Sequence, residues 1–154
     1  MARLLDSIEP VEFGWTNSVS YADYASRDMT LRPDAARYEC GTLNTVGCFG
    51  LRASLELLLE VGTATASAAV ESLADRIYEG VRSRGYETLV DRTPATAAGI
   101  VSFRHPTIDY RVLVSDLKRQ KVTAAPRQGW VRTSPHFYIS PDDIDRLLFE
   151  LPRV

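Results

Sequence analysis

At 154 residues the chain has the length of one domain, and its composition, 45% hydrophobic and 25% charged, is ordinary for a globular protein with a buried core. The net charge of −2 gives no basic surface for nucleic acid or an anionic membrane, and the two cysteines, Cys40 and Cys48, form neither a disulfide framework nor a zinc-binding spacing. Because no apolar run reaches the roughly 20 residues that cross a bilayer, and the first residues lack the apolar core of a signal peptide, we expect a cytoplasmic protein with no membrane partner.

The first 48 residues show little periodicity. Val11–Trp15 could form a short strand or an extended segment, but the rest of this stretch alternates neither as a strand nor as a helix. Several aromatic residues occur in it without a pattern: Phe13, Trp15, Tyr21 and Tyr24. This combination indicates an extended N-terminal arm that packs on another surface.

Two helices are predicted next. From Gly50 the apolar residues Leu51, Leu55, Leu58 and Leu59 fall on one face, and the run ends at Gly62. A second helix begins at Thr63 or Thr65 as the N-cap and ends at Gly85. Its apolar stripe consists of Ala69, Val70, Leu73, Ile77 and Val81.

The period then changes to that of strands. Residues 87–90 and 99–104 are predicted strands, and the second is rich in β-branched residues. Asp109 can cap a third helix, whose apolar face would consist of Val112, Leu113 and Leu117. Residues 122–125 and 130–133 are predicted to form two further strands around a turn at residues 126–129.

The last helix has clear start signals. Ser140 is the predicted N-cap, Pro141 occupies the first helical position, and Asp143 completes a capping-box-like pattern. The predicted buried face consists of Ile144, Leu147, Leu148 and Leu151. Together the elements predict an α+β fold: a small, largely antiparallel sheet covered by helices on one side, with an extended N-terminal arm.

Gly41 and Thr42 precede the first predicted helix and are candidate anion ligands. Glycine permits a tight turn, and threonine offers both a hydroxyl and a backbone N–H to an anion. The same pair is equally compatible with a plain loop that contains a side-chain-stabilised turn.

Arg127 and Arg132 bracket a predicted turn and are candidate carboxylate ligands. The planar guanidinium suits two-point binding of a carboxylate. An ordinary exposed surface arginine is the alternative for both. Arg132 differs because it lies within a strand-like segment next to apolar residues, where a charged group needs a partner.

The segments Arg37–Asn44 (RYECGTLN) and Arg127–Tyr138 (RQGWVRTSPHFY) resemble the C-terminal part of class V aminotransferases, which are pyridoxal-phosphate (PLP) enzymes. The resemblance implies that Thr42, beside Gly41, contacts the cofactor phosphate of a partner subunit. It implies that Arg132 binds the α-carboxylate of an amino-acid substrate and that Arg127 is a second active-site arginine. Residues 1–48 would be the tail of the large PLP-binding domain with its interface loop, and residues 49–154 the small C-terminal domain.

The resemblance also implies that the lysine that holds PLP lies upstream of these segments. The two lysines of the chain, Lys118 and Lys121, are predicted to be solvated charges at a helix end. We therefore expect the C-terminal portion of an enzyme, inactive alone, that works in a homodimer or with a large-domain partner. Transamination, racemisation and β-elimination stay open. Residues 128–130 contain no cysteine where cysteine desulfurases carry theirs, which argues against desulfurase activity.

Two other interpretations remain from the sequence. The chain could be a non-catalytic interaction module or a subunit that pairs with a separate PLP-binding chain, in which case the N-terminal aromatic residues should lie exposed. A free-standing small-molecule binder that uses the two arginines is the other possibility, and it requires a closed pocket.

Overall fold

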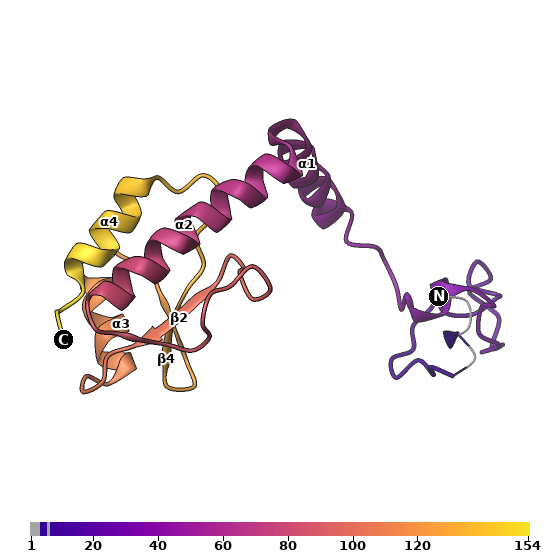
Figure 1. The fold of residues 1–154 in the computed structure, drawn as a ribbon. Coiled ribbons are helices and arrows are strands. Elements are labelled where there is room, and N and C mark those ends of the chain that lie inside the picture. The colour runs from indigo at the N-terminus through magenta and orange to yellow at the C-terminus, as the bar shows by residue number, and fades with distance from the viewer. Residues whose placement is uncertain (1–3, 6) are drawn as a thin grey trace. The chain divides into compact units, whose positions relative to one another are not determined.

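The structure is a computed structural model that describes residues 4, 5 and 7–154 of the chain. Two units are distinguished within it, one that ends at Leu55 and one that runs from Glu56 to Val154 (Figure 1). The second unit holds the sheet and most of the helical residues. The assignment of residues 1–48 and 49–154 to a large and a small domain stays a prediction.

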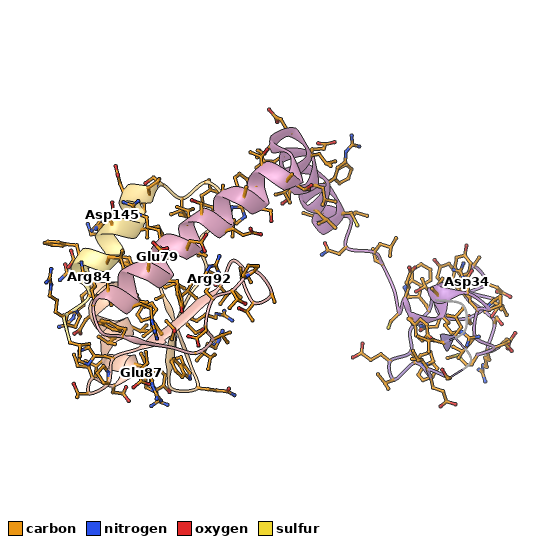
Figure 2. The ribbon with its side chains drawn as sticks, in the orientation of Figure 1. Asp34, Glu79, Arg84, Glu87, Arg92 and Asp145 are labelled. Atoms are coloured by element: carbon orange, nitrogen blue, oxygen red, sulfur yellow. The ribbon has the colours of Figure 1, made fainter. Side chains whose placement is uncertain are left out.

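Side-chain hydrogen bonds organise the N-terminal unit, which has little regular structure. Asp34 caps a short 3-10 helix (η2, Ala35–Tyr38) by accepting a hydrogen bond from the Ala36 N–H (Figure 2). The buried Asn17 amide accepts from the Gly14 N–H and donates to the Arg37 carbonyl oxygen at 2.6 Å.

Of the two alternatives for Val11–Trp15, a short strand or an extended segment, the strand does not form, since none of these residues is in one. The Gly14 N–H is bound by the Asn17 side chain and is unavailable for a ladder. A single isolated bridge, between Ser18 and Leu31, is the β pairing described in this unit.

Helix α1 (Thr45–Val61) begins earlier than the sequence indicated, at Thr45 rather than near Gly50. Asn44 explains the difference, because its side-chain oxygen accepts a hydrogen bond from the Gly47 N–H at 2.9 Å, as an N-cap residue does. No residue of α1 is buried. The predicted apolar face therefore exists without a core to cover it within this structure.

Helix α2 (Thr63–Ser83) is the longest helix of the second unit. Its N-cap is Gly62, with φ of 85°, and it has no side-chain cap, so the prediction of Thr63 or Thr65 as the cap is wrong. Gly62 directly follows the last residue of α1 and occupies the cap position. Thr63 is therefore already the first residue of α2 and Thr65 lies within its first turn. The predicted stop at Gly85 is confirmed: α2 ends at Ser83, and Gly85 follows with φ of 90°.

Four antiparallel strands form the sheet: β1 (Glu87–Thr88), β2 (Val101–Arg104), β3 (Ala125–Arg127) and β4 (Trp130–Thr133). Their order is β1-β2-β4-β3. The predicted strands at residues 87–90 and 99–104 are shorter than expected. The strand predicted at residues 122–125 lies instead at Ala125–Arg127, because the turn contains only Gln128 and Gly129, both with positive φ.

The remaining two helices begin where their caps predict. Asp109 caps α3 (Tyr110–Arg119), and the Ser140–Asp143 capping box starts α4 (Pro141–Glu150). The serine hydroxyl and backbone N–H both bond the Asp143 carboxylate and hold its pKa below the usual range. Val112 was predicted on the buried face of α3 but is exposed, because Leu113 and Leu117 define the face that meets β3 and β4.

One apolar core joins α2, α3, α4 and the sheet, which confirms the α+β fold with helices on one side. The largest fully buried side chains of this unit are Phe103, Ile77, Leu113, Leu117, Val81 and Val131. Outside the core, Arg76 of α2 binds Asp145 of α4 through two hydrogen bonds of 2.7 and 2.5 Å, and these bonds lower the pKa of Asp145 (Figure 2).

None of the described helices is by itself long and apolar enough to cross a membrane. The neighbouring helices α1 and α2 meet that criterion of length and composition only when they are taken together as a bent pair.

Candidate functional site

The candidate site is the open sheet face, which we define as the side of β1–β4 turned away from the apolar core. Side chains alternate along β2 and β4 as a strand requires. Val101, Phe103, Val131 and Thr133 are buried against the helices, whereas Ser102, Arg104, Trp130 and Arg132 are exposed or half-buried. Polar and aromatic groups from separate strands therefore gather on one surface.

The strand register arranges this face in two rows. In the first row Ser102 pairs with Arg132, and Arg132 pairs in turn with Ala125. Leu89 extends this row, because its N–H donates to the Ser102 carbonyl oxygen at 2.9 Å. In the second row Glu87 pairs with Arg104, and Trp130 pairs with Arg127.

Arg104 is neutralised and held in place within the second row. Its guanidinium donates two hydrogen bonds to Oε2 of Glu87, at 2.8 and 2.6 Å, and lies 4.6 Å from the centre of the Trp130 ring (Figure 2 labels Glu87). An ion pair combined with a cation–π contact fixes the side chain without leaving a free charge. Arg104 therefore forms a wall of the site and is not its free cation.

Arg132 is the uncompensated cation of the first row. The residue is half-buried, and its Nε atom is buried with no hydrogen-bond partner among the residues that the structure describes. A buried donor without an acceptor destabilises a fold unless a ligand supplies one. A carboxylate that binds the guanidinium through two oxygens would satisfy this donor and neutralise the charge.

Arg127 reaches the same face from the edge strand β3. It is exposed, and its Nη1 atom contacts the neighbouring Pro126 carbonyl oxygen at 3.4 Å. The structure thus brings the two predicted arginines onto one surface. Sequence analysis missed Ser102, Arg104 and Trp130. The alternation of residues along strands 99–104 and 130–133 was the available signal, but the pairing of β2 with β4 could not be deduced from it.

Gly41 and Thr42 lie in the N-terminal unit, between η2 and α1. Gly41 is half-buried, and a Cβ atom at this position would lie 3.6 Å from Nε1 of Trp15. Thr42 is exposed, and no hydrogen bond of its hydroxyl occurs within the described part of the chain. Its hydroxyl is therefore available to a ligand.

The two lysines lie at the end of α3, and the two cysteines lie in the N-terminal unit. Lys118 is exposed in the last turn of α3, and Lys121 is exposed just beyond that helix. Both cysteines are free thiols. Cys40 is half-buried, and Cys48 is exposed in the first turns of α1, none of whose residues is buried.

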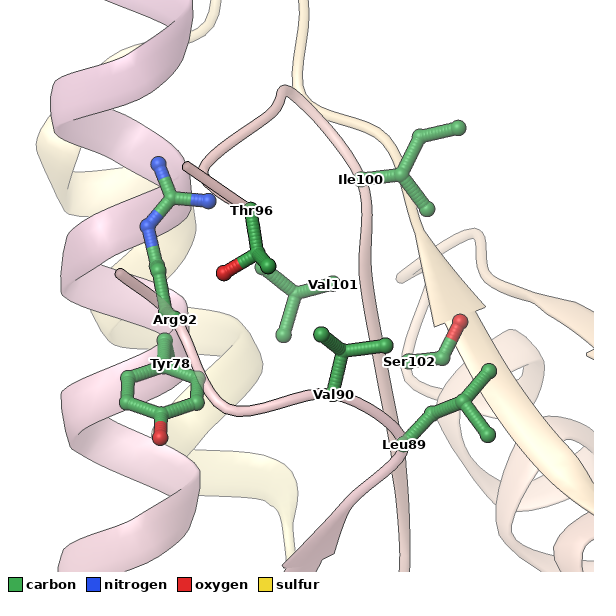
Figure 3. Close-up of a pocket in the computed structure, with 8 residues that line it drawn as sticks. All are labelled: Tyr78, Leu89, Val90, Arg92, Thr96, Ile100, Val101 and Ser102. Atoms are coloured by element: carbon green, nitrogen blue, oxygen red, sulfur yellow. The ribbon is translucent and has the colours of Figure 1, made fainter. Parts of the chain in front are cut away.

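A small cavity of about 150 Å³ adjoins the first row, between α2 and the start of β2. Figure 3 shows that Leu89, Ile100 and Ser102 point away from α2, whereas Val101 points toward it. Arg92 fixes the loop between Leu89 and Ile100, because it forms an ion pair with Asp75 and donates a hydrogen bond to the Ala98 carbonyl oxygen at 2.6 Å.

Comparison with solved structures shows the same fold in PLP-family proteins. The chain superposes on a cysteine desulfurase from Thermococcus onnurineus NA1 with a TM-score of 0.83 and 22% identity, covering 96% of this chain and 39% of that one. For the cysteine desulfurase CsdA from Escherichia coli the TM-score is 0.81 and the identity 20%, with 97% and 39% covered.

The family itself is shown by sequence. The family model described as aminotransferase class V matches residues 1–147, so the chain belongs to this family. A curated relative, the uncharacterized aminotransferase YcbU of Bacillus subtilis (strain 168), is 24% identical over 149 residues. That alignment covers 97% of this chain and 38% of the relative, so the chain spans well under half the length of the proteins that it matches.

Proposed function

We propose that this chain forms the C-terminal part of a PLP-dependent class V enzyme that acts on an amino acid, and that Arg132 binds the substrate carboxylate. One observation carries the proposal: the buried Arg132 Nε atom lacks an acceptor among the described residues. A carboxylate is the group that best completes a guanidinium in this position. The resemblance of Val131–Ser134 to the family's carboxylate-binding segment supports the same role.

The residues present also suit the cofactor. When bound, PLP supplies the electron sink for chemistry at the α-carbon of an amino acid. Gly41 and Thr42 would contact the cofactor phosphate of a partner subunit through the Thr42 hydroxyl and backbone N–H groups. Arg127, exposed on the open sheet face, would act as the second arginine of the site.

The geometry of the face explains how the substrate would be oriented. The carboxylate docks against Arg132, because the neighbouring Arg104 is already neutralised by Glu87. The planar guanidinium then fixes the plane of the carboxylate and so limits the rotation of the α-carbon. Sites on strands hold such geometry better than sites on loops do. Transamination, racemisation and elimination all need this orientation and stay open as reaction types.

The test is a titration of the 17.1 kDa chain followed by NMR of the arginine Nε–H signals. L-alanine should shift the Arg132 signal in a saturable manner, whereas L-alaninamide, which lacks the carboxylate, should not. Arg127→Lys, which keeps the Arg132 Nε–H as the reporter, should weaken the response without abolishing it. An Arg132 signal that ignores L-alanine would contradict the proposal.

A second experiment concerns the covalent attachment of the cofactor. We propose that the chain alone has no turnover, because Lys118 and Lys121 are exposed at the end of α3, away from the open sheet face. Borohydride reduction after incubation with PLP, followed by peptide mapping, should give no defined label on either lysine. Stoichiometric labelling of one of them would contradict this part of the proposal.

The exposed apolar surface of α1 favours association with another polypeptide. An interaction module would require the same property. Six apolar residues of α1 are exposed: Val46, Phe49, Leu51, Leu55, Leu57 and Leu59. We propose that they pack on the part of the class V fold that this sequence does not contain, or in a homodimer. Light scattering should show concentration-dependent association, reduced by Phe49→Ser with Leu59→Ser. A strictly monomeric chain would contradict it.

A further inference from the structure

We infer that the open sheet face selects an amino acid with an apolar side chain, which lies over Leu89 and Ile100 while its carboxylate binds Arg132. This inference rests on the proposed function and adds the substrate class to it. Ser102 lies between the two parts of the site, since it pairs with Arg132 on one side and bonds Leu89 on the other.

The first row sets the distance that a substrate must span between the carboxylate-binding Arg132 and the apolar residue Leu89. Neighbouring strands are about 4.8 Å apart, so Leu89 and Arg132, on either side of β2, are separated by about 10 Å across the sheet. The guanidinium spans part of this distance. A substrate with several carbons beyond the α-carbon covers the rest and passes over the small Ser102 side chain. A short substrate such as alanine would leave Leu89 uncovered.

The side chains at the Leu89 end of the first row are apolar. Leu89 is 54% exposed and Ile100 is 53% exposed, so two large aliphatic residues on one face of the sheet are open to water. Both point to the same side as Ser102, away from α2 (Figure 3). Burial of this aliphatic surface under a substrate side chain would remove it from water.

Among the residues of Glu56–Val154, which the structure describes in full, no free cation lies at this end to bind a second carboxylate. Arg92, the nearest arginine of the adjoining cavity, is committed to Asp75 and to the carbonyl oxygens of Ala98 and Glu71. Arg104 is committed to Glu87. The arginine that remains exposed on this face, Arg127, lies on β3, at the opposite edge of the sheet. Apart from the Ser102 hydroxyl, an acidic substrate side chain would therefore meet aliphatic groups at this end.

The segments that carry Leu89 and Ile100 are also held in position before any substrate binds. The Arg92 side chain is only 9% exposed and fastens the loop before β2 to α2. Leu89 is fixed to β2 by its backbone hydrogen bond to Ser102. A preorganised surface loses less entropy when a ligand binds, so even this shallow contact can discriminate between side chains.

The experiment compares L-leucine, L-alanine and L-glutamate in NMR titrations of the same chain. The Arg132 Nε–H signal reports the carboxylate, and the methyl signals of Leu89 and Ile100 report the side chain. L-leucine should bind about tenfold more tightly than L-alanine and shift both methyl signals, if its extra carbons are about half-buried. L-glutamate should bind no more tightly than L-alanine.

Variants at exposed positions keep the test separate from folding. Leu89→Asn with Ile100→Thr should weaken L-leucine binding relative to L-alanine binding, so that the two ligands bind equally tightly. Val112→Thr, an equally exposed position on α3, is the matched control and should change neither. If Arg132 responds equally to L-alanine and L-leucine, or prefers L-glutamate, the substrate class is wrong and the proposed function stands. If Arg132 responds to none of the three, both are overturned.

Discussion

Ser102 and Arg132 are paired in register across β2 and β4, and both side chains project from the face of the sheet that the helices leave open. The pairing puts a small polar group beside a guanidinium whose Nε has no acceptor in the described part of the chain. The same strands turn Phe103 and Val131 into the core. Each strand therefore contributes to the core with one set of residues and to the candidate site with the other.

Arg132 should destabilise the folded chain when no ligand is present. Replacing Arg132 with Met removes a partly buried charge that has an unsatisfied donor, so the free energy of unfolding should stay unchanged or rise by up to about 1 kcal/mol. Urea denaturation measures it. Arg104→Met is the matched comparison and should lower stability by about 1 kcal/mol, since it removes an ion pair and a cation–π contact. A loss above about 1 kcal/mol in Arg132→Met would indicate a structural arginine instead.

The hairpin that carries Arg127 depends on two residues with positive φ. Gln128 has φ of 45° and Gly129 has φ of 94°, the conformation of a two-residue turn that favours Asn-Gly. Gln128→Asn should raise thermal stability by about 0.5 kcal/mol, because asparagine tolerates the left-handed region better than glutamine does. Gly129→Ala should lower it by about 1 kcal/mol through strain alone, since nothing lies near its Cβ position. Equal melting temperatures for all three proteins would refute this assignment of the turn.

Gly80 permits the close approach of α2 and α4. A Cβ atom at this position would lie 2.3 Å from Cδ1 of Leu148 and 3.0 Å from its Cγ. Gly80→Ala should lower the free energy of unfolding by about 1 kcal/mol, because overpacking outweighs the gain in helix propensity. In a Leu148→Ala background the same change should become stabilising, since the new methyl group then fills a cavity. Additive effects in this double-mutant cycle would show that the two residues do not interact.

Tyr86 should make the stability of the chain fall at high pH. Burial raises the pKa of Tyr86 to about 12, from an ordinary value of 10.0, with a smaller opposing effect of Arg84. The unfolded chain releases the Tyr86 proton at lower pH than the folded one, so the contribution is complete below pH 10 and is lost between about pH 10 and 12. The loss should be about 2 kcal/mol.

Tyr86→Phe provides the control for this titration. It should cost about 1 kcal/mol at neutral pH, because the Pro152 carbonyl oxygen loses its 2.8 Å hydrogen bond from the Tyr86 hydroxyl. Above pH 10 its stability should decline less steeply than that of the unmodified chain. Parallel pH profiles of the two proteins, measured by urea denaturation, would show that Tyr86 titrates normally.

Local sequence patterns predicted those parts of the fold that depend on neighbouring residues. Asp109 and Ser140 cap the helices that they were expected to cap, and Gly85 follows the end of α2. These signals act through hydrogen bonds and backbone angles within a few residues, so the sequence alone specifies them. The family motif likewise lies in contiguous residues.

By itself, the sequence determined the caps of α3 and α4, the β2 strand, the α+β class and the family. The tertiary structure alone decided which side chains share a surface. Val101 and Thr133 are 32 positions apart, yet their strands pair in a register that sets Ser102 beside Arg132 and Arg104 over Trp130. It also decided that Val112 faces solvent and that α1 lies uncovered. Periodicity shows that a strand or helix has two faces, but only packing against distant elements determines which of them becomes the core.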